Sequence, residues 1–550
     1  MIQKLFGSKM LKSTPMESVS AAALVITLAG IVSNVMGLFR DRFLASTFGA
    51  GDTLDIYYAA FRIPDLIYNL LILGALSAAF IPVFTGLITN KEKQDEAWEL
   101  ASDMMNLAIS FIVIFSVIFA IFAPWLMKLI APGFSAEKIG TAVIFTRIMF
   151  LSPLFLGISG VMGGVLTSMK HFFVFSVAPL LYNAGIIFGI LVLTKSMGPI
   201  GLAWGVVLGA FLHMTLQYAV VRNLGYRHRW TFLASLKNKN IKVVLKLMFP
   251  RMAGIAINQM NLIISSIFAS TLAAGSLAVF TFSQNLQSVP FTVFGISFAI
   301  AAFPALSAYA AQGEKQKFVK VFSETFRQIM FFVIPLSIFI IVLRAQLVRA
   351  VLGAGEFDWN DTVLTFQCLG YFSISIFAQS AVQLLARSFY ALKDTKTPFY
   401  VAIATEAINI GLIMLLIGKF QVLGLAIAFS VASIVQMLLL LFVLRTRFDD
   451  LDDKNIIESI VKISVASLLA SVAIQVSKSQ IGEAIEIDTF VKIMIQLVIP
   501  ALVGLGVFAL LCELFKINEF IVFKQAISKK LFKKYAMQTA IENTDEVNRV

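Results

Sequence analysis

Charged residues are scarce in this chain of 550 residues. Asp, Glu, Lys and Arg make up 14% of it, whereas hydrophobic residues make up 59%. Soluble domains contain about 25% charged residues, so this balance excludes an ordinary soluble protein. The net charge of +13 would suggest nucleic acid in a soluble chain, but here the basic residues gather in alternate loops and both tails, as in the cytoplasmic segments of membrane proteins. We therefore expect contact with membrane lipids and none with nucleic acid.

Residues that carry catalysis or hold metals are also scarce. The chain has two cysteines, Cys368 and Cys512, both in apolar runs, and only three histidines. It contains no GxxxxGK[ST] phosphate loop, no HExxH motif and no CxxC pair. We therefore expect no disulfide framework, no metal site, no cofactor and no enzyme active site.

Long hydrophobic runs, by contrast, follow one another along nearly the whole chain. A run of roughly 20 or more apolar residues is long enough to cross a bilayer as a helix. The sequence therefore predicts an all-α polytopic membrane protein with about fourteen transmembrane helices. The predicted spans are about 20–47, 54–88, 98–131, 137–168, 172–195, 199–223, 243–271, 276–310, 318–352, 362–391, 396–418, 421–445, 456–478 and 489–514.

The distribution of lysine and arginine predicts the orientation of these spans. Loops after even-numbered spans are basic, whereas the loops at 48–53, 271–276 and 480–488 contain no Lys or Arg. Basic loops remain in the cytoplasm. Both termini are therefore predicted to be cytoplasmic.

An internal repeat divides the chain. LASTFGAG (Leu44 to Gly51) returns as FASTLAAG (Phe268 to Gly275), and the turn at Lys170 pairs at nearly the same shift with the turn at Lys393. Each copy holds six spans, so the two lobes would be related by an axis along the membrane normal. The predicted organisation is a cytoplasmic tail at 1–19, an N-terminal six-helix lobe at 20–223, a basic cytoplasmic linker at 224–242, a C-terminal six-helix lobe at 243–445, two extra helices at 456–514 and a basic tail at 515–550.

Charges inside the spans indicate where a substrate binds. A charge at the bilayer centre costs a few kcal/mol or more, so such residues usually mark a substrate or ion path. Arg40 and Arg42 lie in the first lobe, where the repeat places Ile264 and Ser266 in the second. The first lobe is therefore predicted to supply the charged half of a cavity, and arginine suits phosphate because its planar fork donates two parallel hydrogen bonds. The alternative is that these charges pair locally near the end of the first span. The candidate substrate-binding residues are Arg40, Asp41, Asp55, Arg42, Arg62, Asn258 and Asn285, and Glu406 is a candidate for ion coupling.

Three motifs carry a resemblance to a known family. They are GLFRDRFLASTFGAGDTLDIYYAAFRIPDL, GALSAAFIPVF (Gly74 to Phe84) and LARSFYALKDTKTP (Leu385 to Pro398). With them the sequence resembles the MurJ/MviN family of lipid II flippases, which is grouped with multidrug and toxin extrusion transporters and polysaccharide flippases. The resemblance implies a bacterial inner-membrane carrier that moves an undecaprenyl-pyrophosphate-linked peptidoglycan precursor to the outer leaflet for cell wall biogenesis. It also implies that the two extra helices form a groove for the lipid tail.

The resemblance extends to individual positions. The family's arginine and acid of span 1 fall on Arg40 and Asp41, and its acid of span 2 falls on Asp55. Asn34 and Asn285 stand where the family commonly has further arginines, and we add Asn34 to the candidate substrate-binding residues. We expect a monomer, with cell-wall synthesis proteins as candidate partners.

Other functions are compatible with the sequence. An ion-coupled exporter of small cations would depend on carboxylates in its cavity, and a flippase for another lipid-linked polysaccharide would use the same arginines. A non-transporting membrane scaffold would use the charges as pairs between helices.

Overall fold

The computed structural model describes residues 19–70, 80–230, 238–484, 486 and 489–525, apart from the side chains of 19–24, 247, 249–255, 257 and 258. Helices are the only regular secondary structure in these ranges, and they contain no strand. The chain forms two compact units. The first comprises Met1–Phe282, Val351–Thr365 and Ile410–Leu425, and the second comprises Ser283–Ala350, Phe366–Asn409 and Ala426–Val550.

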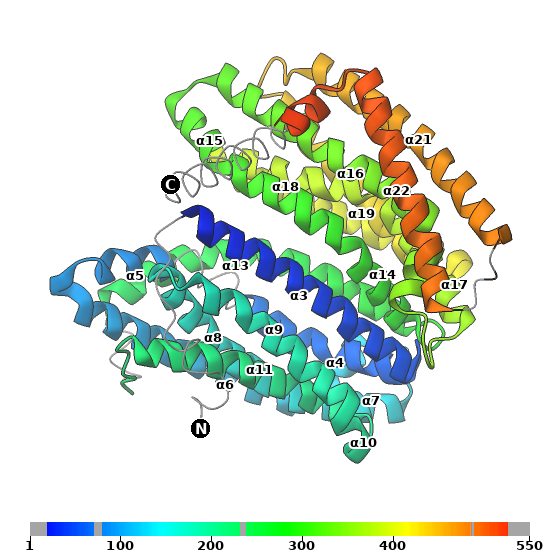
Figure 1. Ribbon diagram of the computed structural model, residues 1–550. Coiled ribbons are helices and arrows are strands. Elements are labelled where there is room, and N and C mark those ends of the chain that lie inside the picture. Colours follow the sequence, from blue (N-terminus) through cyan, green and yellow to red (C-terminus); the bar gives the residue numbers. More distant parts are fainter. Residues whose placement is uncertain (1–18, 71–79, 231–237, 485, 487–488, 526–550) are drawn as a thin grey trace, which may run out of the picture. The chain divides into compact units, whose positions relative to one another are not determined.

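The first unit is built mainly from the N-terminal helices. In Figure 1, α9 lies beside both α3 and α11. Its helices are α3 (Val19–Phe48), α4 (Asp52–Tyr68), α5 (Ile81–Ile88), α6 (Gln94–Ile130), α7 (Ala136–Met149), α8 (Leu151–Ser168), α9 (Phe172–Phe188), the π-helical η3 (Gly189–Leu193), α10 (Thr194–Met197), α11 (Ile200–Asn223) and α13 (Lys239–Ser270). A short 3-10 turn, η2 (Lys91–Lys93), precedes α6.

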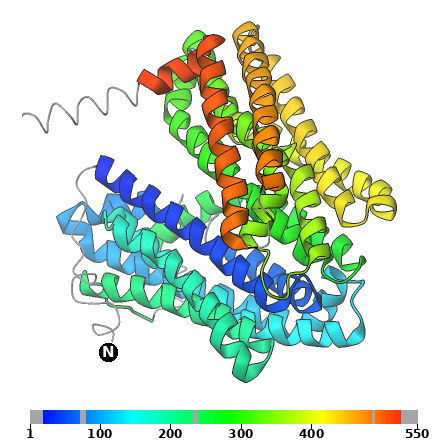
Figure 2. The same ribbon diagram turned by 45° about the vertical axis from the view of Figure 1, so that its right-hand side comes forward.

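The second unit contains most of the remaining helices, and α14, α16, α17, α19 and α20 contribute residues to both units, α16 by its last residue alone. Figure 2 shows α21 and α22 running side by side. The helices are α14 (Ser276–Pro290), the π-helical η4 (Phe291–Ile296), α15 (Ser297–Gln312), α16 (Lys315–Val351), α17 (Trp359–Ser373), α18 (Ile376–Ala391), α19 (Lys396–Phe420), α20 (Val422–Arg445), α21 (Asp453–Ala484) and α22 (Phe490–Leu514).

The helices fit the predicted spans closely. Every one of the fourteen predicted ranges contains helix within the described residues. Ten described segments are long and apolar enough to cross a membrane, and α17 with α18, bent by 44° at their junction, would make an eleventh. The prediction of an all-α polytopic membrane protein is confirmed, while the count of fourteen spans stays a prediction.

Matching positions of the sequence repeat share an unusual backbone conformation. Lys170 (φ 63°) and Lys393 (φ 60°) both lie in the left-handed region directly after a helix. In both turns the next residue closes the helix end, because His171 N donates to Leu166 O at 2.8 Å and Asp394 N donates to Phe389 O at 2.9 Å. Two lysines at positions that favour glycine, 223 positions apart, support the internal repeat independently of the motif letters.

The helices α9 and α11 approach each other at glycine. A Cβ atom on Gly185 would stand 2.2 Å from Gly209 Cα, and one on Gly189 would stand 2.4 Å from Gly205 Cα. Any larger residue would push the helices apart, because those neighbours are backbone atoms that no rotamer change can move. Small residues that allow close backbone approach are typical of helix pairs in membranes.

Candidate functional site

A cavity of about 320 Å³ lies within the first unit, between helices of the N-terminal lobe. Its wall combines one arginine and one aspartate with hydroxyl, imidazole and aromatic groups. The lining residues are Arg40 of α3, Tyr57, Phe61, Pro64, Asp65 and Tyr68 of α4, Met149 of α7, Ser152, Pro153 and Leu156 of α8, Pro179, Tyr182 and Ile186 of α9, and Val206 and His213 of α11.

Arg40 supplies positive charge to this cavity. Its Nε and Nη2 atoms donate to Asp41 Oδ1 at 3.0 and 2.8 Å, and its Nη1 atom donates to Asn183 Oδ1 at 3.3 Å. Asp41 is buried, whereas a quarter of the Arg40 side chain is exposed. A guanidinium has five N–H donors. Three are used by these bonds, and within the described ranges the other two have no acceptor, so they are open to a ligand while Asp41 and Asn183 hold the group in place.

The rest of the wall suits a ligand with both polar and flat apolar parts. Tyr57 packs against Phe61 with ring centroids 5.7 Å apart. His213 is held by Ser159, whose hydroxyl lies 2.6 Å from the ring Nδ1 atom. This bond agrees with the view that a lone histidine in a membrane helix is a packed hydrogen-bonding residue rather than a metal ligand. The described residues contain no cluster of acids, histidines and cysteines that could hold a metal ion.

Asp55 has a different environment from Arg40. Its side chain is 2% exposed, and its oxygens accept hydrogen bonds from the backbone N–H groups of Gly275 (2.7 Å) and Ala278 (2.9 Å). These groups belong to the N-terminus of α14, which has no partners for its first N–H groups within the helix. Asp55 therefore caps α14 in this conformation, and both of its oxygens are occupied. Its predicted substrate contact stays a prediction.

Two further predicted arginines contact protein groups. Arg62 Nε donates to Ser266 Oγ at 2.6 Å, and its Nη2 atom is buried without a partner among the described residues. Arg42 Nη1 donates to Val351 O at 3.2 Å. Neither lines the cavity, although Asp65, one turn after Arg62, does.

The predicted amide and acid candidates are scattered. Asn34 is exposed on α3, and Asn285 is half-buried on α14. Glu406, on α19, accepts from Asn409 Nδ2 at 3.2 Å. The side chain of Asn258 lies outside the described residues. Of the predicted residues, the structure places Arg40 at the cavity with Asp41 beside it.

Sequence reasoning missed most of the cavity wall. Tyr57, Tyr68 and Tyr182 reach it from two helices, and Asn183 positions Arg40 from α9. The available signal was polar and aromatic residues in otherwise apolar spans, but that signal does not say which face of a helix looks inward.

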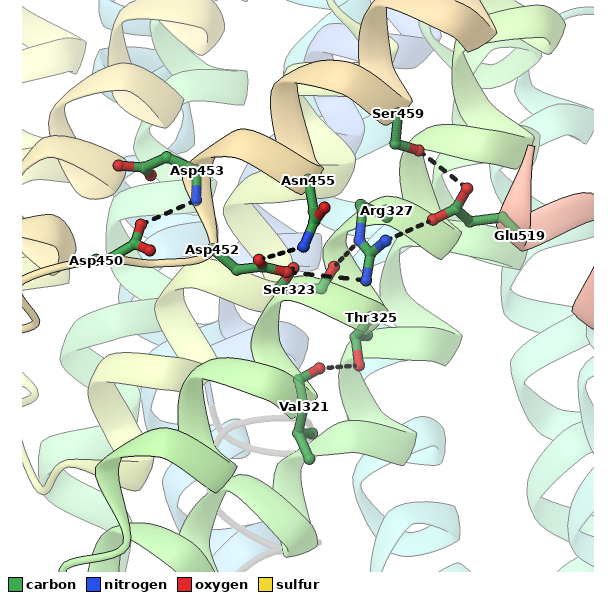
Figure 3. A network of polar contacts seen from close by, with 10 residues as sticks. All are labelled: Val321, Ser323, Thr325, Arg327, Asp450, Asp452, Asp453, Asn455, Ser459 and Glu519. Carbon is green, nitrogen blue, oxygen red and sulfur yellow. Dashed lines mark hydrogen bonds and ion pairs between the residues drawn. The ribbon is translucent and has the colours of Figure 1, made fainter. Parts of the chain in front are cut away.

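A second polar cluster lies within the second unit (Figure 3). Arg327 of α16 forms ion pairs with Glu519 at 3.2 Å and Asp452 at 3.9 Å, and Ser459 donates to Glu519 at 3.0 Å. Ser323 also donates to Asp452 at 2.6 Å. The side chains of Arg327 and Glu519 are 14% and 6% exposed. The cluster joins α16 to the loop before α21 and to the chain after α22, beside a hollow of about 640 Å³.

Comparison with known proteins places most of the chain in one family. The family model described as "Lipid II flippase MurJ" matches residues 44–496. A probable lipid II flippase MurJ from Buchnera aphidicola subsp. Baizongia pistaciae is 26% identical over 504 residues, covering 90% of this chain and 97% of the relative. A protein of the same description from Rhizobium tropici is 29% identical over 422 residues, covering 74% and 78%.

Solved structures share the fold. One described as "Lipid II flippase MurJ, inward closed conformation" superposes with a TM-score of 0.73 at 24% identity, covering 90% of this chain and 99% of that one. An inward-facing multidrug resistance transporter of the MATE family superposes with a TM-score of 0.65 at 13% identity, covering 78% and 99%.

Proposed function

The chain belongs to the MurJ family of lipid II flippases, and from this premise we propose that it moves lipid II from the inner to the outer leaflet of a bacterial inner membrane. Membership makes it a transporter rather than an enzyme. The observation that carries the proposal is Arg40, which lines the cavity and has two N–H donors that no acceptor of the described part of the chain takes up.

The chemistry of the cavity fits the polar head of such a lipid. The two free donors of Arg40 would bind pyrophosphate oxygens, because a guanidinium pairs with phosphate through parallel, charge-assisted hydrogen bonds. Tyrosine rings and hydroxyls at Tyr57, Tyr68 and Tyr182 would contact the sugars. The polyprenyl tail would stay in lipid beside α21 and α22, where long apolar side chains are exposed, among them Val472 (59%) and Leu502 (61%).

Transport would proceed by alternating access between the six-helix lobes at 20–223 and 243–445. Asp55 supports this mechanism, because it joins α4 of the first lobe to the N-terminus of α14 of the second through two hydrogen bonds. Such a link can open without leaving a buried charge, since water replaces the backbone partners once the end of the helix is exposed. We expect Asp55 to hold the lobes together at this end while the cavity receives substrate.

Both termini would be cytoplasmic, and the chain would act as a monomer near cell-wall synthesis proteins. Glu406 would serve ion coupling. A flip rate in vesicles that ignored imposed potential and sodium or proton gradients would exclude coupling while leaving flipping itself intact.

Complementation tests the function directly. Bacteria depleted of their own lipid II flippase would express the parent chain, Arg40→Ala or the matched control Arg222→Ala, in which an exposed arginine at the end of α11 is removed. We expect growth with the parent and the control and lysis with Arg40→Ala, at equal amounts of protein in the membrane. Lysis with all three would reject lipid II as the substrate.

One observation favours a second candidate function. Asp65 also lines the cavity, and an exporter of small cations requires a carboxylate there. Purified protein that gained thermal stability from organic cations but not from pyrophosphate lipids would favour export of cations.

A further inference from the structure

Two cations near the C-terminal end of α16, Arg344 of that helix and Lys478 of α21, have no acidic partner among the residues that the structure describes. Arg344 Nη1 donates to Ile341 O, and Lys478 Nζ of α21 donates to Val342 O at 2.9 Å. Arg344 also lies over the Phe366 ring, with its Cζ atom 5.8 Å from the centroid. No aspartate or glutamate of the described residues forms a salt bridge with either cation, and the two positive charges repel each other.

Unpaired cations here require an explanation. Arg344 and Lys478 are half-buried on apolar helices, and carbonyl groups and an aromatic ring do not neutralise their charge. With the orientation proposed above, this end of α16 faces outward, where lysine and arginine are disfavoured. Charged residues at such depth usually pair or serve a ligand. Within the described residues no anion fills this role, so the site is open to an anionic ligand.

A buried amide adds a second requirement. Gln346 of α16 donates to Gln496 Oε1 of α22 at 3.1 Å, and Gln496 in turn donates to Lys478 O at 3.3 Å. Gln346 is 9% exposed, and its Oε1 atom is buried with no hydrogen-bond partner among the described residues. An unsatisfied buried acceptor is costly, so this junction of α16, α21 and α22 also calls for a hydroxyl or N–H donor.

The surroundings identify the source of the anion. On α21 and α22, within three residues of Lys478 and Gln496 along the chain, apolar side chains are exposed, including Val476 (51%), Val498 (41%) and Ile499 (46%). In a membrane these side chains meet acyl chains rather than water. A ligand at this junction therefore joins an anionic, hydroxyl-bearing head to a hydrocarbon tail.

We propose that the junction of α16, α21 and α22, together with the Arg344 side chain that lies against Phe366 and Gly370 of the adjoining α17, binds a phospholipid with a phosphate and a hydroxylated head group, of the phosphatidylglycerol type. Arg344 and Lys478 bind the phosphate, and a head-group hydroxyl donates to Gln346 Oε1. The site is separate from the Arg40 cavity and does not depend on which substrate that cavity carries. Its assignment to the outer leaflet rests on the proposed orientation.

Lipid binding to the delipidated full-length protein in detergent provides the test. Bound lipids are counted by native mass spectrometry, and the affinity is the lipid concentration at which half of the protein carries a lipid. The parent chain should bind phosphatidylglycerol at least tenfold more tightly than phosphatidylcholine. Inorganic phosphate should not compete. If phosphate displaced the lipid, the site would be one for a free anion, and the lipid proposal would be wrong.

Variants then assign the contacts. Arg344→Gln with Lys478→Gln should weaken binding of phosphatidylglycerol at least tenfold, whereas Lys478→Arg should preserve it. Lys462→Gln is the matched control, because Lys462 is on α21 but pairs with Glu458 at 2.7 Å. If the double variant does not fold, Lys478→Gln alone replaces it, and we expect it to weaken binding of phosphatidylglycerol about threefold. Unchanged binding in the folded variants would overturn the proposal.

The hydroxyl contact has its own readout. The parent chain should prefer phosphatidylglycerol over phosphatidylmethanol, which has the same charge but no hydroxyl. Gln346→Leu should abolish that preference while leaving phosphatidylmethanol binding unchanged. A preference that survived Gln346→Leu would contradict the role of this residue.

Discussion

Each unit holds a partly buried arginine paired with acid, but the two arginines differ in how many acids neutralise them. Arg327 contacts two acids, Glu519 and Asp452, that come from different segments of the chain. Arg40 contacts one acid, its own neighbour Asp41, and lines a cavity. A buried arginine alone therefore does not identify a binding site. The informative features are the number of acids that neutralise the arginine and whether the arginine lines a cavity.

The largest expected effect is a loss of stability at Arg327, the arginine that pairs with two acids. Glu519→Leu should destabilise the protein by about 3–5 kcal/mol. It removes the nearer acid of Arg327 and leaves this largely buried charge with Asp452 alone, at 3.9 Å. Unfolding in increasing denaturant would measure the loss. Glu513→Gln is the control, since the nearby Glu513–Lys524 pair is exposed and should matter little. Equal stability of the two variants would mean that the Arg327 cluster is not a structural clamp.

Transport should respond instead at Arg40. Arg40→Lys retains a positive charge beside Asp41 but loses the planar fork, so the flip rate in vesicles should fall at least about tenfold, or roughly 1.4 kcal/mol, with little change in thermal stability. Arg327→Lys should give the opposite result, with lower stability and an unchanged flip rate in the folded protein. If both variants behaved alike, the distinction between a binding and a structural arginine would fail.

A smaller effect is expected where Asp55 caps α14. Asp55→Ala should cost about 1–2 kcal/mol, because the N–H groups of Gly275 and Ala278 lose their acceptors. Hydrogen exchange should accelerate at those two amides, while amides late in α14 stay protected. Asp55→Asn, which keeps one acceptor oxygen, should lie between parent and alanine. Slow exchange at Gly275 in Asp55→Ala would contradict the capping role.

The smallest effect concerns an ion pair near the surface. Hydrogen bonds from Thr397 and from Arg447, whose charge also contributes, outweigh the effect of burial and lower the pKa of Asp394 to about 2, from an ordinary value of 3.8. Asp394 therefore stabilises the folded state above about pH 4, and this contribution disappears as pH falls toward 2. Thermal unfolding scanned from pH 5 to 2 should show a drop of a few degrees beyond that of Asp394→Asn. Identical pH profiles for parent and variant would reject the assignment.

The sequence predicted the fold better than the site. Span positions follow from the lengths of apolar runs, and the turns at Lys170 and Lys393 could be matched from motif letters alone. Arg40 was found because a charge in an apolar span is conspicuous. The pairing of Asp55 with Gly275 could not be found from the sequence, because 220 residues separate them. The donor is also a backbone N–H group, which every residue other than proline carries and which therefore leaves no sequence signal. The tyrosines of the cavity were missed for a similar reason, since their inward direction depends on how the helices pack.

The glycine contacts between α9 and α11 bear on how this protein can evolve. Gly185 and Gly189 set the distance between the two helices through backbone alone. Tyr182 on α9 and Val206 on α11 line the cavity from the same helix pair, and Tyr182 meets Gly209 of α11 through its backbone rather than its side chain. Substitution of these two side chains would therefore change the cavity wall without changing the backbone contacts that set the distance between the helices. The glycines fix the scaffold, and the residues around them are free to diversify.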